Sequence, residues 1–141
     1  MLRLNQKQFD FIKASCEQAY PDEGCGVLWG ETIDGVKHVR AVEEVPNDSG
    51  GDKRRRFELS AATLFSLTKR ERTGPHKLLG FYHSHPDHPA VPSSVDKDAA
   101  WPVYSYPIIS VVHGHTTTWN SWVLKEDGSG YDAEVVEVVA A

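Results

Sequence analysis

Residues 77–84 read Lys-Leu-Leu-Gly-Phe-Tyr-His-Ser and form an apolar run just after a Gly74-Pro75 break. A short apolar run bounded by breaking residues is typical of a buried strand, so we predict a central strand here. Residues 86–92 hold three prolines and are expected to form a loop. Residues 94–101 should then form a short helix, which Pro102 ends.

Upstream of this strand, the sequence predicts a helix followed by a hairpin. Asn5 and Gln8 have the spacing of a capping box, and apolar residues then recur on one face, so a helix is expected from about residue 6 to 19. An Asp34-Gly35 pair is a strong signal for a hairpin turn. The two strands that it joins are predicted at residues 24–30 and 36–45.

The remaining segments complete a mixed domain. Residues 46–55 are polar and rich in glycine, which predicts a mobile loop, and the basic run from Lys53 to Arg56 should be solvated there. Ser60 is the expected N-cap of a second long helix. Further strands are predicted at residues 56–59, 106–113, 117–125 and 131–139. This order indicates an α/β (α+β) fold in which a sheet is covered by about two long helices.

Composition limits the classes of function. The 141 residues are 40% hydrophobic and 25% charged, which suits a single domain over residues 1–141. The net charge of −5 and the absence of a dense basic stripe argue against binding to nucleic acid or to an anionic membrane. No apolar run approaches the length of a membrane span, and residues 1–7 lack the apolar region of a signal peptide. Two cysteines are too few for a disulfide scaffold, so we expect a cytoplasmic protein, of unknown oligomeric state.

One segment holds residues that indicate chemistry: His83-Ser84-His85-Pro86, followed after five residues by Pro92-Ser93-Ser94-Val95-Asp96. Side chains two apart on a strand leave the same face, so His83 and His85 can converge on one ion. Asp96, in the first turn of the helix expected after Ser93, is the candidate third ligand. Two histidines and one carboxylate would leave the fourth position of a tetrahedral zinc open, as in a hydrolytic zinc site.

Hydrolysis also needs a group that takes a proton from water, usually a glutamate. Glu23 directly precedes the strand expected at residues 24–30, and a carboxylate at a strand entrance can reach the mouth of a neighbouring strand. It lies 60 residues before His83, so spacing alone does not place it at the same site.

The pattern His83-x-His85-Pro86-x5-Pro92-Ser93-x-x-Asp96, with Glu23-x-Cys25-Gly26-x-Leu28-x-Gly30 upstream, resembles the JAMM (MPN-plus) metalloproteases, specifically their short bacterial and archaeal members. The resemblance implies a mixed sheet curled against two main helices, with a short helix at the metal site. It implies that one Zn²⁺ is held by His83, His85 and Asp96. It further implies that Glu23 activates the water and passes its proton to the leaving amine, and that the Ser93 hydroxyl helps to hold the oxyanion.

The same resemblance implies an activity. Members of this family cleave amide or isopeptide bonds, and the bacterial ones act on the C-terminal tails of ubiquitin-like sulfur-carrier proteins. The expected function is therefore that of a zinc metallopeptidase that hydrolyses an amide at such a tail. An extended tail could add as a strand beside residues 36–45 or residues 46–60. The alternative is a non-catalytic scaffold of the same fold that binds a partner protein.

Simpler interpretations of the same residues remain open. Ser93 could only cap the next helix, with Asp96 three residues on favouring the positive helix end. Glu23 could be a solvated turn acid. His113-Gly114-His115 repeats the His-x-His spacing but lacks the Pro-Ser-x-x-Asp that should follow. Cys25, in an apolar strand, is expected to be a small buried residue and not a nucleophile. The His-x-Glu and Pro-Cys-x-x-Cys signature of a zinc deaminase is absent.

Overall fold

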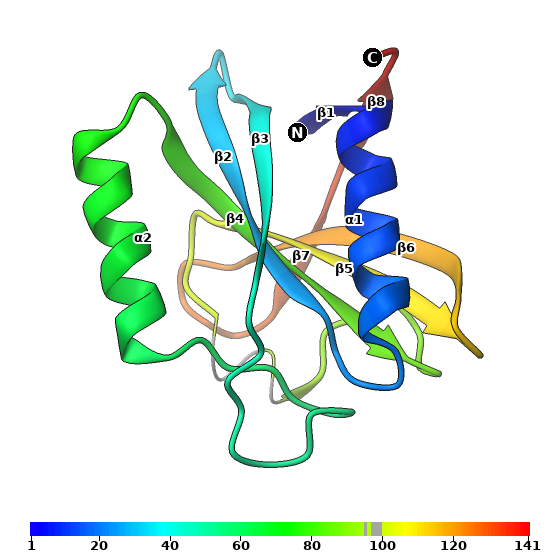
Figure 1. The fold of residues 1–141 in the computed structure, drawn as a ribbon. Helices are drawn as coiled ribbons and strands as arrows, with labels where there is room; N and C mark the ends of the chain where they lie inside the picture. The colour runs from blue at the N-terminus through cyan, green and yellow to red at the C-terminus, as the bar shows by residue number, and fades with distance from the viewer. Residues whose placement is uncertain (95, 97–99) are drawn as a thin grey trace.

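The computed structural model describes residues 1–94, 96 and 100–141, which fold as an eight-stranded mixed sheet with two long helices (Figure 1). The helices are α1 (Gln6–Ala19) and α2 (Ala61–Thr73). The strands, in chain order, are β1 (Leu2–Asn5), β2 (Cys25–Ile33), β3 (Val36–Val45), β4 (Lys77–Pro86), β5 (Ser105–Val112), β6 (His115–Leu124), β7 (Tyr131–Glu134) and β8 (Val136–Val139). The mixed fold with two main helices, predicted from the sequence, is confirmed.

Local signals set the start of α1 and the β2–β3 turn. Asn5 accepts a hydrogen bond from the Gln8 amide at 2.8 Å, and the Gln8 side chain accepts one from the Asn5 amide at 2.8 Å, so the predicted capping box is present. Asp34 and Gly35 have φ values of 51° and 78°, which are the left-handed angles that a two-residue hairpin turn requires.

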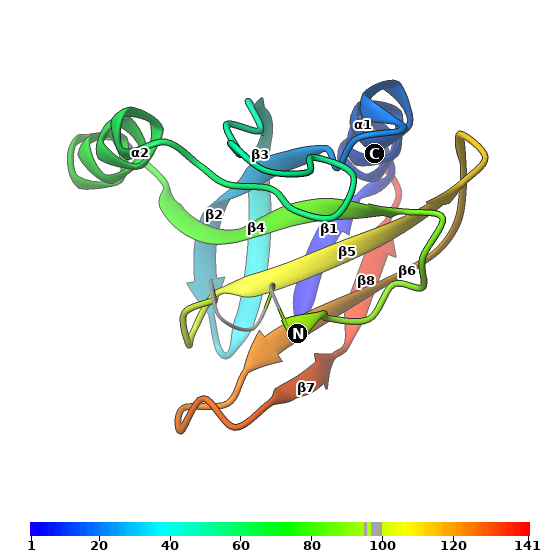
Figure 2. The same cartoon turned by 90° about the horizontal axis from the view of Figure 1, so that it is seen from below.

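The strand order is β7-β6-β5-β4-β2-β3-β1-β8, which places β7 and β8 at the two edges of the sheet. These two strands are separated in the chain by Val135 alone. The sheet therefore curls until its edges meet end to end along one extended segment, as Figure 2 shows. At this closure the Glu134 carboxylate accepts hydrogen bonds from Ser105 (3.0 Å) and Ser121 (2.8 Å).

The two helices lie on opposite sides of the central strands (Figure 1). One core cluster joins α1 to the sheet through buried residues that include Ile12, Leu28 and Tyr82. The other joins α2 to the alternate side chains of the same strands and includes Leu67, Val27 and Phe81. Since side chains alternate along a strand, His83 shares the face of Phe81 and not that of Tyr82.

Three expectations about the elements are corrected or fall partly outside the described residues, and one strand was not expected. Residues 56–59 form no strand, although the Asp48 amide donates to the Glu58 carbonyl at 2.8 Å. Residues 131–139 form two strands instead of one, and β1 was not predicted. Of the helix expected over residues 94–101, Ser94 and Asp96 are helical, Ala100 and Trp101 are not, and residues 95 and 97–99 lie outside the described residues.

Within the residues that the structure describes, neither helix has the length and apolar character needed to cross a membrane.

Candidate metal centre

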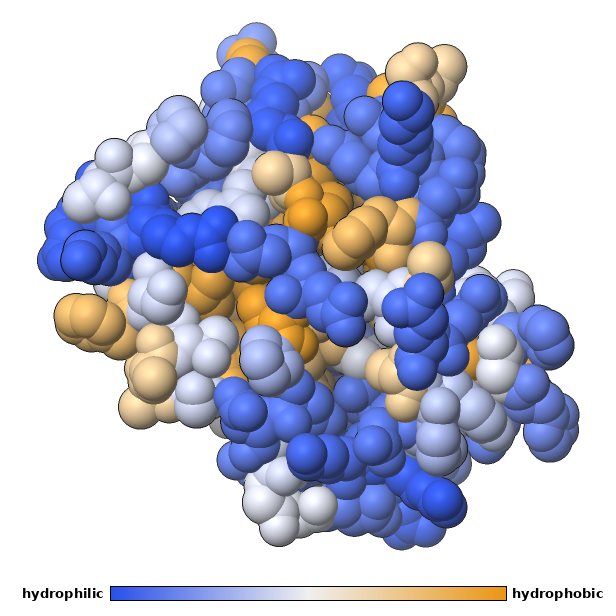
Figure 3. All heavy atoms as spheres, in the orientation of Figure 1, coloured by the Kyte–Doolittle hydropathy of each residue, from blue (hydrophilic) through white to orange (hydrophobic). Residues whose placement is uncertain are grey.

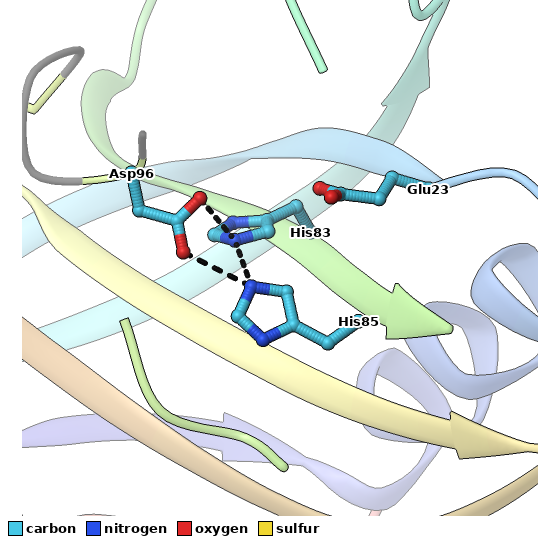
Figure 4. A group of neighbouring side chains, drawn as sticks. All are labelled: Glu23, His83, His85 and Asp96. Atoms are coloured by element: carbon cyan, nitrogen blue, oxygen red, sulfur yellow. Dashed lines mark hydrogen bonds and ion pairs between the residues drawn. The ribbon is translucent and has the colours of Figure 1, made fainter. Parts of the chain in front are cut away.

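Strand β4 ends at the site and carries its two histidines. His83 and His85 are both buried, and their Nε2 atoms face each other at 3.1 Å (Figure 4). This convergence follows from the period of two in a strand, which places alternate side chains on one face. Tyr82, which directly precedes His83, points to the opposite face, where its hydroxyl lies 2.9 Å from the Ser15 hydroxyl of α1.

Asp96 joins the two histidines from the helical turn that follows the loop at residues 86–92. Its carboxylate oxygens lie 3.2 Å from His83 Nε2 and 3.0 Å from His85 Nε2 (Figure 4). Ser93 fixes the turn, since its amide donates to Asp96 Oδ2 at 2.9 Å and its Oγ accepts from the Asp96 amide at 3.1 Å. Ser93 is therefore a helix cap, as the simpler interpretation held, and its hydroxyl proton stays available to another acceptor.

A backbone carbonyl orients His85 from outside the cluster. Its Nδ1 lies 2.8 Å from the Pro89 carbonyl oxygen, which can only accept, so this nitrogen carries the proton. The Nε2 lone pair is then free to point into the cluster. A carbonyl behind a histidine is the usual arrangement that fixes the tautomer of a metal ligand.

The separation of these donor atoms fits a metal ion. Ligands at about 2.0–2.1 Å from a tetrahedral zinc lie roughly 3.3 Å from one another. The two histidine Nε2 atoms are 3.1 Å apart. Asp96 Oδ2 lies 3.0 Å from His85 Nε2, and the other carboxylate oxygen, Oδ1, lies 3.2 Å from His83 Nε2. Two imidazoles and one carboxylate are also a donor set that zinc accepts in catalytic sites. His83, His85 and Asp96 could therefore hold a zinc ion with little movement.

Glu23 reaches this cluster through the pairing of β2 with β4. The strands are antiparallel, with Cys25 opposite His83, so the residues before β2 lie beside the end of β4. Ser84, between the two histidines, fixes this approach because its Oγ accepts from the Gly24 amide at 2.8 Å. Glu23, His83, His85 and Asp96 each offer a ligand atom, and these atoms all lie within 4.8 Å of one another.

The Glu23 carboxyl is buried next to the cluster. The residue is 4% exposed, and its Oε1 has no hydrogen-bond partner among the described residues. Burial raises the pKa of Glu23 to about 8. A solvated turn acid would be exposed to water and would keep an ordinary carboxyl pKa, so the simpler interpretation of Glu23 is wrong.

The other charged groups of the cluster respond to burial and to each other. Burial lowers the pKa of His83. Burial also opposes the charge on His85, but the hydrogen bonds with Asp96 and the Pro89 carbonyl, together with the nearby charges of Asp96 and Glu23, outweigh it, and the pKa of His85 is raised. Burial would raise the pKa of Asp96, yet its hydrogen bonds with His83 and His85 hold that pKa below the ordinary range.

Two hollows open beside the cluster. The first, which we call the basic cavity, has a volume of about 450 Å³ and is lined mainly by polar and charged residues, namely Glu23, Arg54, Arg55, His85, His88 and Ser93. The second, the apolar groove, has a volume of about 250 Å³ and is lined mainly by Phe57, Leu59, Leu64, Phe81, Trp101 and Tyr106. Figure 3, in the orientation of Figure 1, shows hydrophobic residues gathered near the centre of the view among hydrophilic ones.

Several residues at these hollows were missed from the sequence. Arg54 and Arg55 belong to the basic run that was expected only to be solvated in a loop, and His88 was not among the candidate site residues. Phe57 stacks on His83 with ring centroids 4.6 Å apart. The local sequence holds no signal for these positions, because residues 53–57 reach the site only through tertiary contacts.

The other candidate residues from the sequence, the His113–His115 pair and Cys25, do not join the metal-type cluster among the described residues. His113 and Gly114 form the β5–β6 turn with φ values of 50° and 84°, and neither His113 nor His115 belongs to the metal-type cluster found among the described residues. Cys25 is buried and free, and burial raises the pKa of its thiol to about 12. An inert structural cysteine is confirmed there.

Comparisons with known proteins agree with this geometry. Residues 5–125 match the family described as prokaryotic homologs of the JAB domain. A protein of Haloferax volcanii named Desampylase is 36% identical over 91 residues, and the matched stretch spans 64% of this chain and 63% of that relative. The chain thus spans less than two thirds of the curated relative's length.

Solved structures show the same fold. A protein from Desulfitobacterium hafniense superposes with a TM-score of 0.85 at 31% identity, covering 100% of this chain and 94% of that one. A JAB1/MPN domain protein from Archaeoglobus fulgidus has a TM-score of 0.56 at 19% identity and covers 99% of both chains.

Proposed function

This chain belongs to the prokaryotic JAB domain family, and from that premise we propose that it is a zinc-dependent metallopeptidase or isopeptidase. Its proposed reaction is hydrolysis of an amide bond at the C-terminal tail of a ubiquitin-like or sulfur-carrier protein. The observation that supports this most directly is the convergence of Glu23, His83, His85 and Asp96, with ligand atoms within 4.8 Å of one another. Residues 1–141 are proposed to act as one domain.

In this proposal His83, His85 and Asp96 hold the zinc ion. A bound zinc ion would supply Lewis-acid polarisation of the scissile carbonyl and would lower the pKa of water. The Pro89 carbonyl orients His85, the Ser93 amide holds Asp96, and the Phe57 ring stacks on His83, so the protein meets the ion with a preorganised donor set.

Glu23 moves the proton. Hydrolysis breaks the C–N bond, forms a C–O bond from water and transfers one water proton to the leaving amine. Glu23 is the sole carboxylate among the described residues that line the basic cavity, where His85 and Ser93 are also found. We therefore assign it as the base that accepts the proton and the acid that returns it.

Ser93 stabilises the developing oxyanion. Its oxygen is occupied as acceptor by the Asp96 amide, which leaves the hydroxyl proton as a donor toward the basic cavity. A hydrogen-bond donor aimed at developing negative charge, in a site that excludes water, lowers the activation barrier by roughly 3 kcal/mol.

The apolar groove suits an extended tail on the acyl side of the scissile bond. Strand β3 lies between β2 and β1, so residues 57–59 are the better edge for strand addition. The Glu58 amide and carbonyl are bonded to Asn47 and Asp48, whereas the backbone groups of Phe57 and Leu59 make no hydrogen bond within the described residues. A tail could pair with these free groups. The Desampylase relative supports a ubiquitin-like protein as the substrate.

The experiment measures cleavage and zinc together. A sulfur-carrier protein extended beyond its Gly-Gly tail is incubated with the zinc-loaded protein, and mass spectrometry follows loss of the extension. The proposal expects cleavage and about one equivalent of zinc per chain. Full zinc occupancy without cleavage of any substrate in a panel would contradict it.

A non-catalytic scaffold is the second candidate. The predicted metal ligands and Glu23 are all present and brought together, which favours the enzyme. Zinc content below about a tenth of an equivalent, after zinc is offered, would favour the scaffold. Both candidates are proposed for a cytoplasmic protein, consistent with the two free cysteines, Cys16 and Cys25.

A further inference from the structure

The metal-type cluster lies between two hollows that differ in their charged residues, since two arginines line the basic cavity and none lines the apolar groove; the two halves of a substrate would therefore be bound differently. His83 and Asp96 border a small cavity that Phe57 shares with the apolar groove. His85 and Glu23 instead line the basic cavity. A scissile bond placed at the cluster would therefore have one side in each hollow.

The position of Glu23 decides which side leaves. The group that returns a proton must lie within hydrogen-bond reach of the amine that departs. Glu23 lines the basic cavity and does not line the apolar groove. The basic cavity is therefore the leaving-group side, and the apolar groove receives the acyl side.

Arg54 and Arg55 give the leaving-group side its charge. Within the described part of the chain neither arginine forms an ion pair with an acid, whereas their neighbour Arg56 lies 3.7 Å from Glu58. The nearby acid Asp87 forms no ion pair with either arginine among the described residues; its carboxylate accepts hydrogen bonds from the Tyr20 hydroxyl and from the His113 amide instead. Two exposed arginines without an ion-pair partner among the described residues thus line a cavity in which Glu23 is the sole described carboxylate.

The turn that carries the arginines is fixed to the catalytic segment. The Glu23 amide donates to the Lys53 carbonyl at 2.7 Å, directly before Arg54. Within the turn, the Arg54 amide donates to the Asp52 side chain at 3.0 Å and the Arg55 amide to the Asp52 carbonyl at 3.1 Å. The backbone of Arg54 and Arg55 is therefore held beside Glu23, and their side chains extend from this fixed turn.

We propose that Arg54 and Arg55 select a leaving group that carries a carboxylate close to its amine. This inference rests on the proposed function, because it concerns the substrate of the same site. Guanidinium groups bind carboxylates through paired, charge-assisted hydrogen bonds. Two cations near the leaving group also favour an anionic group over a neutral one of the same size.

Two kinds of leaving group offer this chemistry. One is a single amino acid attached through its α-amine, whose α-carboxylate lies two bonds from the leaving nitrogen. The other is a residue with an acidic side chain. A lysine attached through its side chain has no carboxylate near the leaving nitrogen, so isopeptides should be the poorer substrates.

The test uses the zinc-loaded protein and one carrier protein that carries different residues after its Gly-Gly tail. The extensions are glycine, glycinamide, aspartic diamide with no carboxylate, and aspartic α-amide with only the side-chain carboxylate. We expect kcat/KM for glycine to exceed that for glycinamide by roughly tenfold or more. If the aspartic α-amide is also cleaved faster than the aspartic diamide, the arginines accept a side-chain carboxylate as well as an α-carboxylate, which supports the inference.

Variants locate the preference. R54Q/R55Q should reduce the ratio of kcat/KM for glycine to kcat/KM for glycinamide to near one, with zinc content still near one equivalent per chain. R54K/R55K should keep part of the preference, since the charge is retained. R56Q is the matched control because Arg56 belongs to the same run but pairs with Glu58, and it should behave as the parent.

A binding measurement keeps this inference separate from the proposed reaction. Glycylglycine and its amide are titrated into ¹⁵N-labelled protein while the Arg Nε–H signals are observed by NMR. The dipeptide acid should shift the Arg54 and Arg55 signals more than the amide does, even if no carrier protein is cleaved. Equal kcat/KM for acid and amide, equal loss of both in R54Q/R55Q, or equal binding of the two dipeptides would overturn the inference.

Discussion

Replacing Glu23 by Gln separates proton transfer from metal binding. The side chain keeps its volume and loses its ability to accept a proton. The hydrogen bonds and ion pairs of His83, His85 and Asp96 do not involve the Glu23 side chain, so these three residues keep their geometry. Zinc content should therefore stay near one equivalent per chain.

The size of the rate loss follows from the surroundings of Glu23. The side chain is almost fully buried, and Glu23 is the sole described carboxylate lining the basic cavity, so no second carboxylate can replace it. General acid–base catalysis contributes typically about 10²–10⁴-fold. We expect kcat to fall by about 10³-fold, equivalent to roughly 4 kcal/mol in the barrier.

The assay follows release of the C-terminal extension by mass spectrometry, with zinc measured on the same samples. Glu44→Gln is the matched control, because this exposed glutamate on the neighbouring strand lies outside both hollows. Glu44→Gln should retain full activity. Activity of Glu23→Gln within threefold of the parent, at equal zinc content, would refute the assignment of Glu23 as base.

Three further predictions concern the ligands, the oxyanion and the α2 helix. His85→Ala should reduce zinc to below a tenth of an equivalent, whereas His113→Ala, from the other His-x-His pair, should retain it; metal analysis distinguishes them. Ser93→Ala should lower kcat by about 10²-fold and, through loss of its capping bond, lower the free energy of unfolding by about 1 kcal/mol; unchanged kcat would restrict Ser93 to the capping role. Arg70 donates two hydrogen bonds to Glu43 and thereby lowers the pKa of that carboxyl, so Arg70→Gln should raise it in an NMR titration. Because the folded-state pKa of Glu43 is depressed, its stabilising effect should be present above the ordinary carboxyl pKa and disappear as the pH falls through the folded value; a stability difference between parent and Arg70→Gln that persists in acid would contradict this.

Features set by neighbouring residues were predictable from the sequence. The capping box at Asn5 and Gln8 and the turn at Asp34-Gly35 each depend on a few adjacent positions, and both are present. Strand alternation alone predicted that the side chains of His83 and His85 lie on the same face of the sheet.

Features that depend on pairing between distant segments were not predictable in the same way. Strand β1 is four residues long and exists because β3 and β8 pair with it on its two sides. The approach of Glu23 depends on the register that places Cys25 opposite His83. Its place before a strand made the approach possible, but only the family resemblance assigned it to this site. Arg54 and Arg55 reach the cavity because the Lys53 carbonyl is bonded to the Glu23 amide, a contact with no local signature.

Anomalous diffraction at the zinc absorption edge, from crystals of the protein purified without chelator, tests the metal centre most directly. The account predicts a single strong peak about 2.0–2.2 Å from His83 Nε2, His85 Nε2 and an Asp96 carboxylate oxygen. A map without a peak at this position from crystals soaked in zinc, or with its strongest peak beside His113 and His115, would contradict it.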